Sequence, residues 1–254
     1  FMAKIVVFDS GFGSLSVIKA IQKKVLADII YFADQKNFPY GTKSVSQLRK
    51  IIRSTITILE KKFKPDLIVI GSNTPSLLLK RLAIESKIIG VFPPLKEATK
   101  NTKSRTIAIL ATKSVVESNA LKNYIKKHVP KKIKVIKINA SPLIELVESG
   151  KFIDNKNLCK KKIRTILLKS LVSNHVDVAT LSSTHLTFLL PLLRQIFPHI
   201  IFLDPRNVVA NQVRKFLSKK NSKTNSLKIF TSGNVSNFQK QLFKLGIKNK
   251  VRSL

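Results

Sequence analysis

The sequence predicts an α/β protein with two similar doubly wound domains, related by pseudo-twofold symmetry, and a cleft between them. Three observations favour this fold class. Short apolar segments alternate with amphipathic segments of helix length, one strand–loop–helix segment occurs twice, and 254 residues suffice for two packed domains. Hydrophobic residues make up 44% of the chain, which is enough for a sizeable core.

Nine short segments are predicted to be strands. Their apolar content is nearly continuous, which is typical of strands buried on both faces of a parallel sheet. In chain order they are Lys4–Phe8, Ile29–Phe32, Leu67–Gly71, Ile88–Phe92, Thr106–Leu110, Ile133–Ile138, Asp177–Leu181, Ile200–Leu203 and Lys228–Thr231.

Eight amphipathic segments between these strands are predicted to be helices. They are Leu15–Lys24, Ser44–Lys62, Ser76–Ser86, Ser114–Lys127, Asn157–Ser173, Thr187–Phe197, Asn207–Leu217 and Asn234–Leu245. This alternation of strands and helices indicates doubly wound sheets.

An internal repeat indicates two copies of one α/β unit. Pro65–Thr74 aligns without gaps on Val176–His185, and Ile5–Ser10 pairs more weakly with Ile107–Thr112. Each copy ends a buried strand with small polar residues and then opens a helix. Ligands bind at the carboxyl ends of strands in open α/β sheets, and a helix start favours anions. We therefore expect two carboxylate-binding elements aimed at one cleft.

The repeat also predicts the domain bounds. The chain would cross between domains at Pro93-Pro94 and again at Asp204-Pro205. The expected domains are residues 1–94 plus 205–254, with the C-terminal segment returning to the first domain, and residues 95–204.

Composition restricts the environment and the partners. No apolar run reaches the ~18–20 residues that a membrane helix needs, and the single cysteine, Cys159, excludes an internal disulfide and a Cys-based zinc site. These features predict a cytoplasmic protein. The net charge of +34 is compatible with a nucleic-acid partner, but the lysines are scattered and form no recognisable nucleic-acid module. We favour solvated basic faces, whose field would also attract an acidic substrate.

Five ordered motifs resemble those of the glutamate racemases, a branch of the aspartate/glutamate racemase superfamily. The family motifs are FDSGxGGLS, YxAD followed by PYGxKS, ACNT, LGCTHY and TSGD. The corresponding segments here are Phe8–Ser16, Tyr31–Asp34 with Phe38–Ser44, Gly71–Thr74, Leu181–His185 and Phe230–Asn234. Within the first motif, Ser14 stands where the family has the second glycine of its pair.

The resemblance implies a two-base racemase that uses neither a metal nor a pyridoxal or other cofactor. In the family, an acidic amino acid such as glutamate lies between two cysteines, one of which removes the α-proton while the other returns one to the opposite face. Family members are often dimers, so a homodimer is also implied.

Site residues follow from the matching motif positions. Asp9 and Ser10 would contact the α-amino end of the substrate, Tyr40 and Gly41 its side-chain carboxylate, and Asn73, Thr74 and Thr184 the remainder. Asp9 and His185 would assist the two acid/base positions. Each assignment has a structural alternative: helix caps for Asp9, Ser10, Asn73 and Thr74, a simple turn for Tyr40-Gly41, and a structural histidine for His185.

The chain departs from the family at both catalytic positions, where Ser72 and Ser183 replace cysteine. A thiol has a pKa of about 8.5 and an alkyl hydroxyl one nearer ~15.7, so forming the base costs about 10 kcal/mol more. We therefore expect racemisation to be very slow or absent. Two explanations stay open: native serines in a protein with another role, such as a catalytically silent acidic-metabolite binder, or serines introduced to trap substrate.

Overall fold

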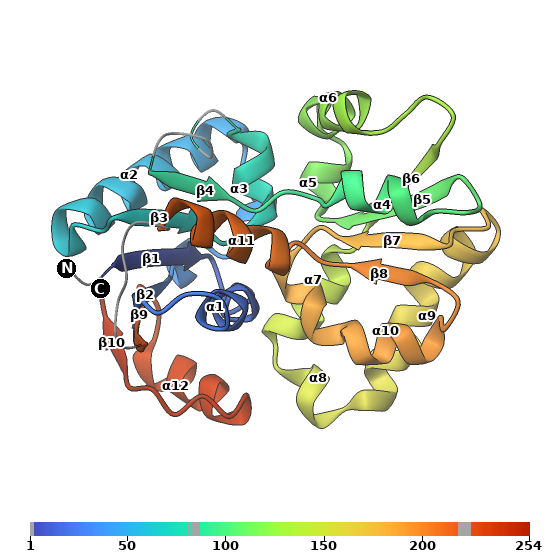
Figure 1. Cartoon of the computed structure of the whole chain (residues 1–254). Helices are drawn as coiled ribbons and strands as arrows, with labels where there is room; N and C mark the ends of the chain where they lie inside the picture. Colours follow the sequence, from blue (N-terminus) through green and yellow to red (C-terminus); the bar gives the residue numbers. More distant parts are fainter. Residues whose placement is uncertain (1–2, 81, 83–86, 218–224) are drawn as a thin grey trace. The chain divides into compact units, whose positions relative to one another are not determined.

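A computed structural model describes residues 3–80, 82, 87–217 and 225–254, which form two compact units. The first unit comprises Phe1–Val91 and Arg206–Leu254, and the second comprises Phe92–Pro205 (Figure 1). The chain therefore leaves the first unit once and returns to it. The bounds predicted from the sequence differ from these by three residues at the first connection and by one at the second.

The first unit is built on a six-stranded, fully parallel sheet with the order β10-β9-β2-β1-β3-β4. Its strands are β1 (Lys4–Asp9), β2 (Asp28–Ala33), β3 (Leu67–Ile70), β4 (Ile88–Gly90), β9 (Ser226–Thr231) and β10 (Val251–Ser253). β2 and β3 are buried along their whole length, which explains their nearly continuous apolar sequence.

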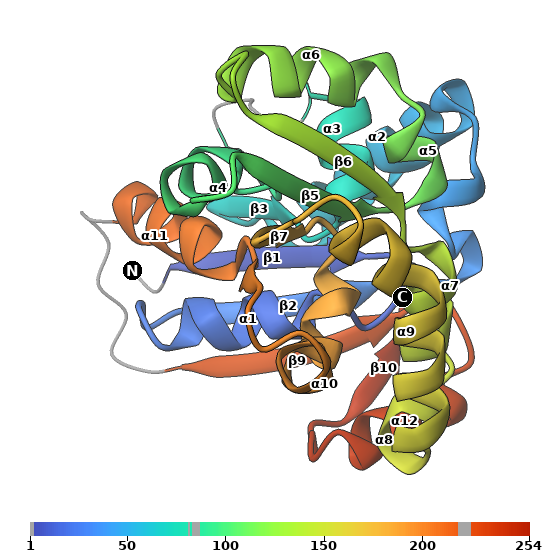
Figure 2. The same cartoon turned by 90° about the vertical axis from the view of Figure 1, so that its right-hand side faces the viewer.

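Helices cover both faces of this sheet. They are α1 (Leu15–Gln22), α2 (Val45–Phe63), α3 (Asn73–Leu78), α11 (Arg206–Phe216) and α12 (Val235–Lys244), with short 3-10 helices η1 (Gln35–Asn37) and η2 (Tyr40–Thr42). α1 packs against α11, and α2 contacts α3 on the opposite face (Figures 1 and 2). The strand order reverses at β1, so the doubly wound connection sends α1 and α2 to opposite faces.

The second unit has a four-stranded parallel sheet with the order β6-β5-β7-β8. Its strands are β5 (Thr106–Ala111), β6 (Lys134–Asn139), β7 (Val178–Leu181) and β8 (Ile201–Leu203). Its helices are α4 (Leu95–Asn101), α5 (Lys113–Val116), α6 (Asn119–His128), α7 (Ser141–Glu148), α8 (Lys151–Asp154), α9 (Lys156–Val172), the 3-10 helix η4 (Thr184–Leu189) and α10 (Leu190–Ile196).

The two sheets repeat one topology. The order β2-β1-β3-β4 in the first unit corresponds to β6-β5-β7-β8 in the second. The aligned aspartates have equivalent roles: Asp66 accepts a hydrogen bond at 2.9 Å from the N–H of Lys4, the first residue of β1. Asp177 accepts from the Lys103 and Ser104 N–H groups at 2.6 and 2.7 Å, just before β5. Asp66, just before β3, is therefore bonded to the start of the neighbouring strand β1. Asp177, just before β7, is likewise bonded to the segment that leads into its neighbour β5.

Several elements differ from their predicted form. The segment expected as one helix over Ser114–Lys127 is two, because Ser118 interrupts it and caps α6 by accepting from the Leu121 N–H. α4, α7, α8 and β10 were not predicted. The prediction Ser76–Ser86 lies partly outside the described residues, and α3 begins earlier, at Asn73.

Candidate functional site

In the first unit, predicted site residues lie at the carboxyl ends of two neighbouring strands. β1 and β3 pair directly, with Phe8 opposite Ile70, so Asp9, which ends β1, and Ser72, which follows β3, lie at the same carboxyl end of the sheet. The strand order reverses between these two strands, which is where open α/β sheets bind ligands. Ser72 is half-buried and precedes the first residue of α3.

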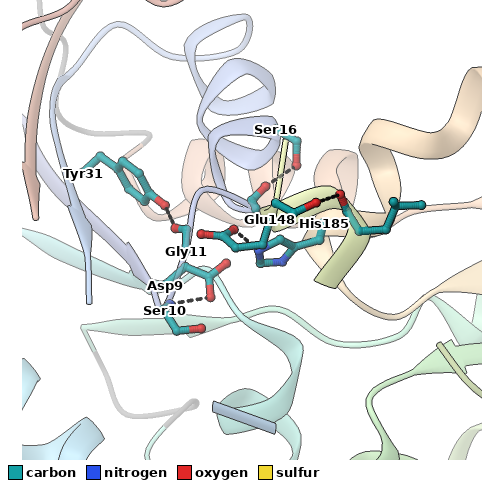
Figure 3. A network of polar contacts seen from close by, with 10 residues as sticks. Asp9, Ser10, Gly11, Ser16, Tyr31, Glu148 and His185 are labelled. Atoms are coloured by element: carbon teal, nitrogen blue, oxygen red, sulfur yellow. Dashed lines mark hydrogen bonds and ion pairs between the residues drawn. The ribbon is translucent and has the colours of Figure 1, made fainter. Parts of the chain in front are cut away.

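The loop after β1 is held by its own polar groups. The Asp9 Oδ1 atom accepts a hydrogen bond from the Ser10 N–H at 2.7 Å, and the buried Tyr31 hydroxyl donates to the Gly11 carbonyl (Figure 3). The N-cap of α1 is Ser14, so the helix-cap alternative for Asp9 and Ser10 is wrong. Asp9 therefore presents a carboxylate at the sheet edge and caps no helix.

Tyr40 and Gly41 begin the 3-10 helix η2, which contacts α3. The turn alternative is correct for the backbone, but the Tyr40 side chain is buried, and its hydroxyl donates to Asp34 Oδ2 at 3.0 Å. Burial, together with the negative charges of Asp34 and Asp9, raises the pKa of Tyr40 well above its ordinary value. Tyr40 is therefore a neutral hydrogen-bond donor near both carboxylates.

Asp34 is the centre of a network that the sequence did not predict. Its carboxylate accepts from Asn37 Nδ2 at 2.9 Å to each oxygen and from Ser232 Oγ at 3.1 Å, besides the bond from Tyr40. These four bonds fill the usual accepting capacity of a carboxylate. The network joins two motif segments, YxAD and TSGD, through side chains.

Asn73 and Thr74 do not cap α3, because Ser72 occupies the N-cap position and its side chain makes no capping bond. The helix-cap alternative is therefore wrong for both residues. Asn73 Nδ2 instead donates to the Val91 carbonyl at 3.1 Å, and Ser76 Oγ accepts from the Val91 N–H at 2.9 Å. The Asn73 Oδ1 atom is buried and makes no hydrogen bond within the described part of the chain.

In the second unit, Ser183, Thr184 and His185 follow β7 at the position equivalent to Ser72–Thr74. Ser183 precedes η4, and all three residues are buried. His185 Nε2 lies 2.9 Å from Glu148 Oε2, and both side chains are nearly buried (Figure 3). A carboxylate that holds an imidazole in this way fixes its orientation and suits it for proton transfer.

Glu148 is a functional candidate that the sequence reasoning missed. It ends α7, whose buried face consists of Leu143, Ile144, Leu146 and Val147 and whose first turn contains a proline. That apolar spacing after a proline is a helix signal, and it would have placed Glu148 on a defined element. Its pairing with a histidine 37 residues away leaves no trace in the sequence.

The structure brings the predicted residues together within each unit. In the first unit Asp9, Ser10 and Ser72 share a sheet edge, and Tyr40 lies near Asp9. In the second unit Ser183, Thr184 and His185 are consecutive. The described residues contain no group of three or more His, Cys, Asp or Glu side chains that could hold a metal ion. Within the same residues, no helix is long and apolar enough to cross a membrane.

Comparison with known proteins gives a consistent result. No protein-family model matches the chain. The glutamate racemase of Buchnera aphidicola subsp. Schizaphis graminum is 32% identical over 234 residues, which cover 87% of this chain and 88% of that protein. The glutamate racemase of Chlorobaculum parvum is 32% identical over 221 residues, covering 84% and 79%.

Solved structures share the fold over nearly the whole chain. A glutamate racemase isoform from Bacillus anthracis superposes with a TM-score of 0.87 at 22% identity, covering 99% of this chain and 97% of that one. The Escherichia coli glutamate racemase, solved with L-glutamate and the activator UDP-MurNAc-Ala, gives 0.85 at 22% identity, covering 100% and 98%. These structures establish the α/β fold with two domains of parallel sheets.

Proposed function

Because this chain belongs to the glutamate racemase family, we propose that it binds glutamate or a similar acidic amino acid and carries a two-base site in which serine replaces cysteine. In this proposal Ser72 and Ser183 are the two catalytic positions, and His185, oriented by Glu148, assists the second. Asp9 assists the first. The reaction would use side chains of this chain alone, without a cofactor.

One observation supports the proposal most directly: the two serines occupy the same position in the two units. Each follows the strand that pairs with its unit's first strand, β3 next to β1 and β7 next to β5. Each is also followed by polar residues at a helix start, where backbone N–H groups favour a carboxylate. Two equivalent positions are what a reaction on opposite faces of one carbon requires.

Substrate contacts are proposed by motif position. Asp9 and Ser10 would bind the α-amino end, and Tyr40 with Gly41 the side-chain carboxylate, to which the neutral Tyr40 hydroxyl is suited as a donor. Asn73, Thr74 and Thr184 would bind the rest. The net charge of +34 would assist by attracting an anionic ligand.

The serines limit the expected rate. A hydroxyl is about 7 pKa units less acidic than a thiol, which costs about 10 kcal/mol in forming the base. Circular dichroism of L-glutamate mixed with the protein measures net racemisation. We expect no racemisation at ordinary enzyme rates, which are roughly 1–10³ per second. Racemisation at a rate in that range would contradict the argument from acidity.

A catalytically silent acidic-metabolite binder is the second candidate. It is favoured by one observation: serine stands at both proposed base positions, while the Asp34–Tyr40 and Glu148–His185 bonds are present. Calorimetry with glutamate, aspartate and other dicarboxylates tests both candidates. Binding without turnover is expected under both candidates, whereas no binding of any of them at millimolar concentration would remove both proposals.

A further inference from the structure

Ser14 and Gly71 lie in direct contact, one residue before the proposed catalytic position 72. A Cβ atom built on Gly71 would lie 2.4 Å from Ser14 Cβ and 2.6 Å from Ser14 Oγ. Carbon atoms in favourable contact are ~3.5–4.0 Å apart, so both distances are severe overlaps. Position 71 can therefore hold only glycine while Ser14 stays in place.

Neither segment can move cheaply to relieve such an overlap. Ser14 Cβ is bonded directly to the backbone, and the Ser14 carbonyl accepts from the Val17 and Ile18 N–H groups at 3.0 Å each. Gly71 is fixed from the other side, because its N–H donates to the Phe8 carbonyl at 2.8 Å. Relief would require the loop after β1 to shift relative to the end of β3.

Positions 14 and 71 both differ from the resembled motifs, and in opposite directions. FDSGxGGLS has glycine at position 14 and ACNT has alanine at position 71, whereas this chain has Ser14 and Gly71. The space between the two segments holds one Cβ atom in either arrangement, supplied from opposite sides. Ser14 therefore adds a Cβ atom where the motif has glycine, and Gly71 lacks the Cβ atom that the motif's alanine has.

The Ser14 hydroxyl gives no stabilising reason for the exchange. Ser14 is fully buried, and its Oγ atom makes no hydrogen bond to any residue in the described ranges. Burying an unsatisfied hydroxyl is unfavourable. Ser14 therefore contributes to the packing through the volume of its Cβ atom, which lies against Gly71.

We propose that Ser14 and Gly71 form a coupled packing pair that positions Ser72 relative to the loop carrying Asp9 and Ser10. Ser14 is then a positioning residue of the site, acting through Gly71. This rests on the proposed function only in taking those two segments as ligand-binding. Gly71, the residue before Ser72, and its contact Ser14 both depart from the resembled motifs.

The test is a coupling cycle that needs no ligand. In a Ser72→Cys background, the alkylation rate of the introduced thiol by iodoacetamide is measured, with the fully buried Cys159 as the slow internal reference. Gly71→Ala should change this rate by about tenfold or more, because relief of the overlap moves the half-buried position 72 and so changes the exposure of its thiol to the reagent. Adding Ser14→Gly should return the rate to within about threefold of the background, because contacting residues are strongly coupled.

A matched variant separates volume from the hydroxyl. Ser14→Ala keeps the Cβ atom that would overlap at 2.4 Å, so it should not rescue Gly71→Ala, whereas Ser14→Gly should. If Gly71→Ala does not fold, recovery of soluble protein by Ser14→Gly but not by Ser14→Ala gives the same answer. Rescue by both, rescue by neither, or an unchanged rate in Gly71→Ala would overturn the proposal.

Glutamate affinity, measured by calorimetry on the same set without the Ser72→Cys change, should follow the same pattern. If the unmodified protein binds no glutamate while the alkylation cycle shows coupling, the proposed function fails and the packing pair stands. If affinity is normal but Gly71→Ala and Ser14→Gly act additively on both readouts, the packing pair fails and the proposed function stands.

Discussion

At the scale of single residues, the Glu148–His185 contact joins two side chains of the second unit that lie 37 residues apart in the chain. Glu148→Gln would leave a nearly buried histidine facing a neutral amide in place of a carboxylate. We expect the free energy of unfolding to fall by about 1.5–3 kcal/mol, the range for hydrogen bonds to charged groups. Urea denaturation at pH 7 measures this.

Glu145 offers a matched control on the same helix, because its side chain is exposed. Glu145→Gln should change stability by no more than about 0.5 kcal/mol. Equal effects of the two substitutions would show that the contact contributes nothing beyond a surface charge.

Tyr40 tests the corresponding network in the first unit. Tyr40→Phe removes one of the four hydrogen bonds to Asp34 and leaves a buried carboxylate less solvated. We expect a loss of about 1.5–3 kcal/mol in the free energy of unfolding. Tyr124→Phe is the comparison, because the Tyr124 hydroxyl donates to a neutral acceptor, the Pro93 carbonyl, at 3.2 Å. Its expected loss is about 0.5–1.5 kcal/mol, and a larger loss there would contradict the charge argument.

At the scale of elements, Asp177 fastens the chain between α4 and β5. Burial acts to raise its pKa, but hydrogen bonds from the Thr102 hydroxyl and the Ser104 and Lys103 N–H groups outweigh this and lower the pKa below its ordinary value. A lowered folded-state pKa contributes stability above the unfolded-state pKa. That contribution is lost as the pH falls through the lower value in the folded state.

Asp177→Asn should therefore cost about 1 kcal/mol at pH 7, a value reduced because the group is partly solvated. The difference from the unmodified protein should shrink as the pH is lowered from about 4 towards 2. Urea denaturation across this range, with Glu145→Gln as control, measures the effect. A difference that stays constant with pH would mean that the carboxylate charge plays no part.

Most strands could be predicted from the sequence. A strand that is buried on both faces of a parallel sheet is a nearly continuous run of apolar residues, which is recognisable without knowledge of the neighbouring strands. β10 has no such apolar run, because it contains three residues and only Val251 is buried, so it was missed. α4 and α7 were missed because their seven and eight residues lie close to neighbouring elements, where short amphipathic patterns are hard to separate from loops.

Only the residues of the candidate site that lie within the matched motifs could be predicted from the sequence. The motif match located Asp9, Tyr40 and His185, but neither Glu148 nor the role of Asp34 could be read from it. Those contacts depend on side chains from distant segments, such as the 198 residues that separate Ser232 from Asp34. The period of the apolar residues and the identity of the turn residues indicate burial and local geometry. Neither indicates which polar side chains come into contact after folding.

At the scale of the whole molecule, the proposed two-base reaction needs a competent base at each of the two proposed catalytic positions, Ser72 and Ser183. Ser72→Cys combined with Ser183→Cys should create or restore glutamate racemisation, because each substitution supplies a base of suitable acidity. The gain could approach the ~10 kcal/mol difference in acidity, although a displacement of about 1 Å at either sulfur could cost ~10²-fold.

The single variants are the controls for this prediction. Each supplies one competent base and should support exchange of the α-proton with solvent, but little net racemisation. NMR in D₂O follows the exchange, and circular dichroism follows racemisation, for the two single variants and the double variant side by side. A folded double variant that binds glutamate and exchanges no proton would show that the site has diverged beyond its two serines. The acidic-metabolite binder would then be the better account, because binding would persist where restored bases fail to act.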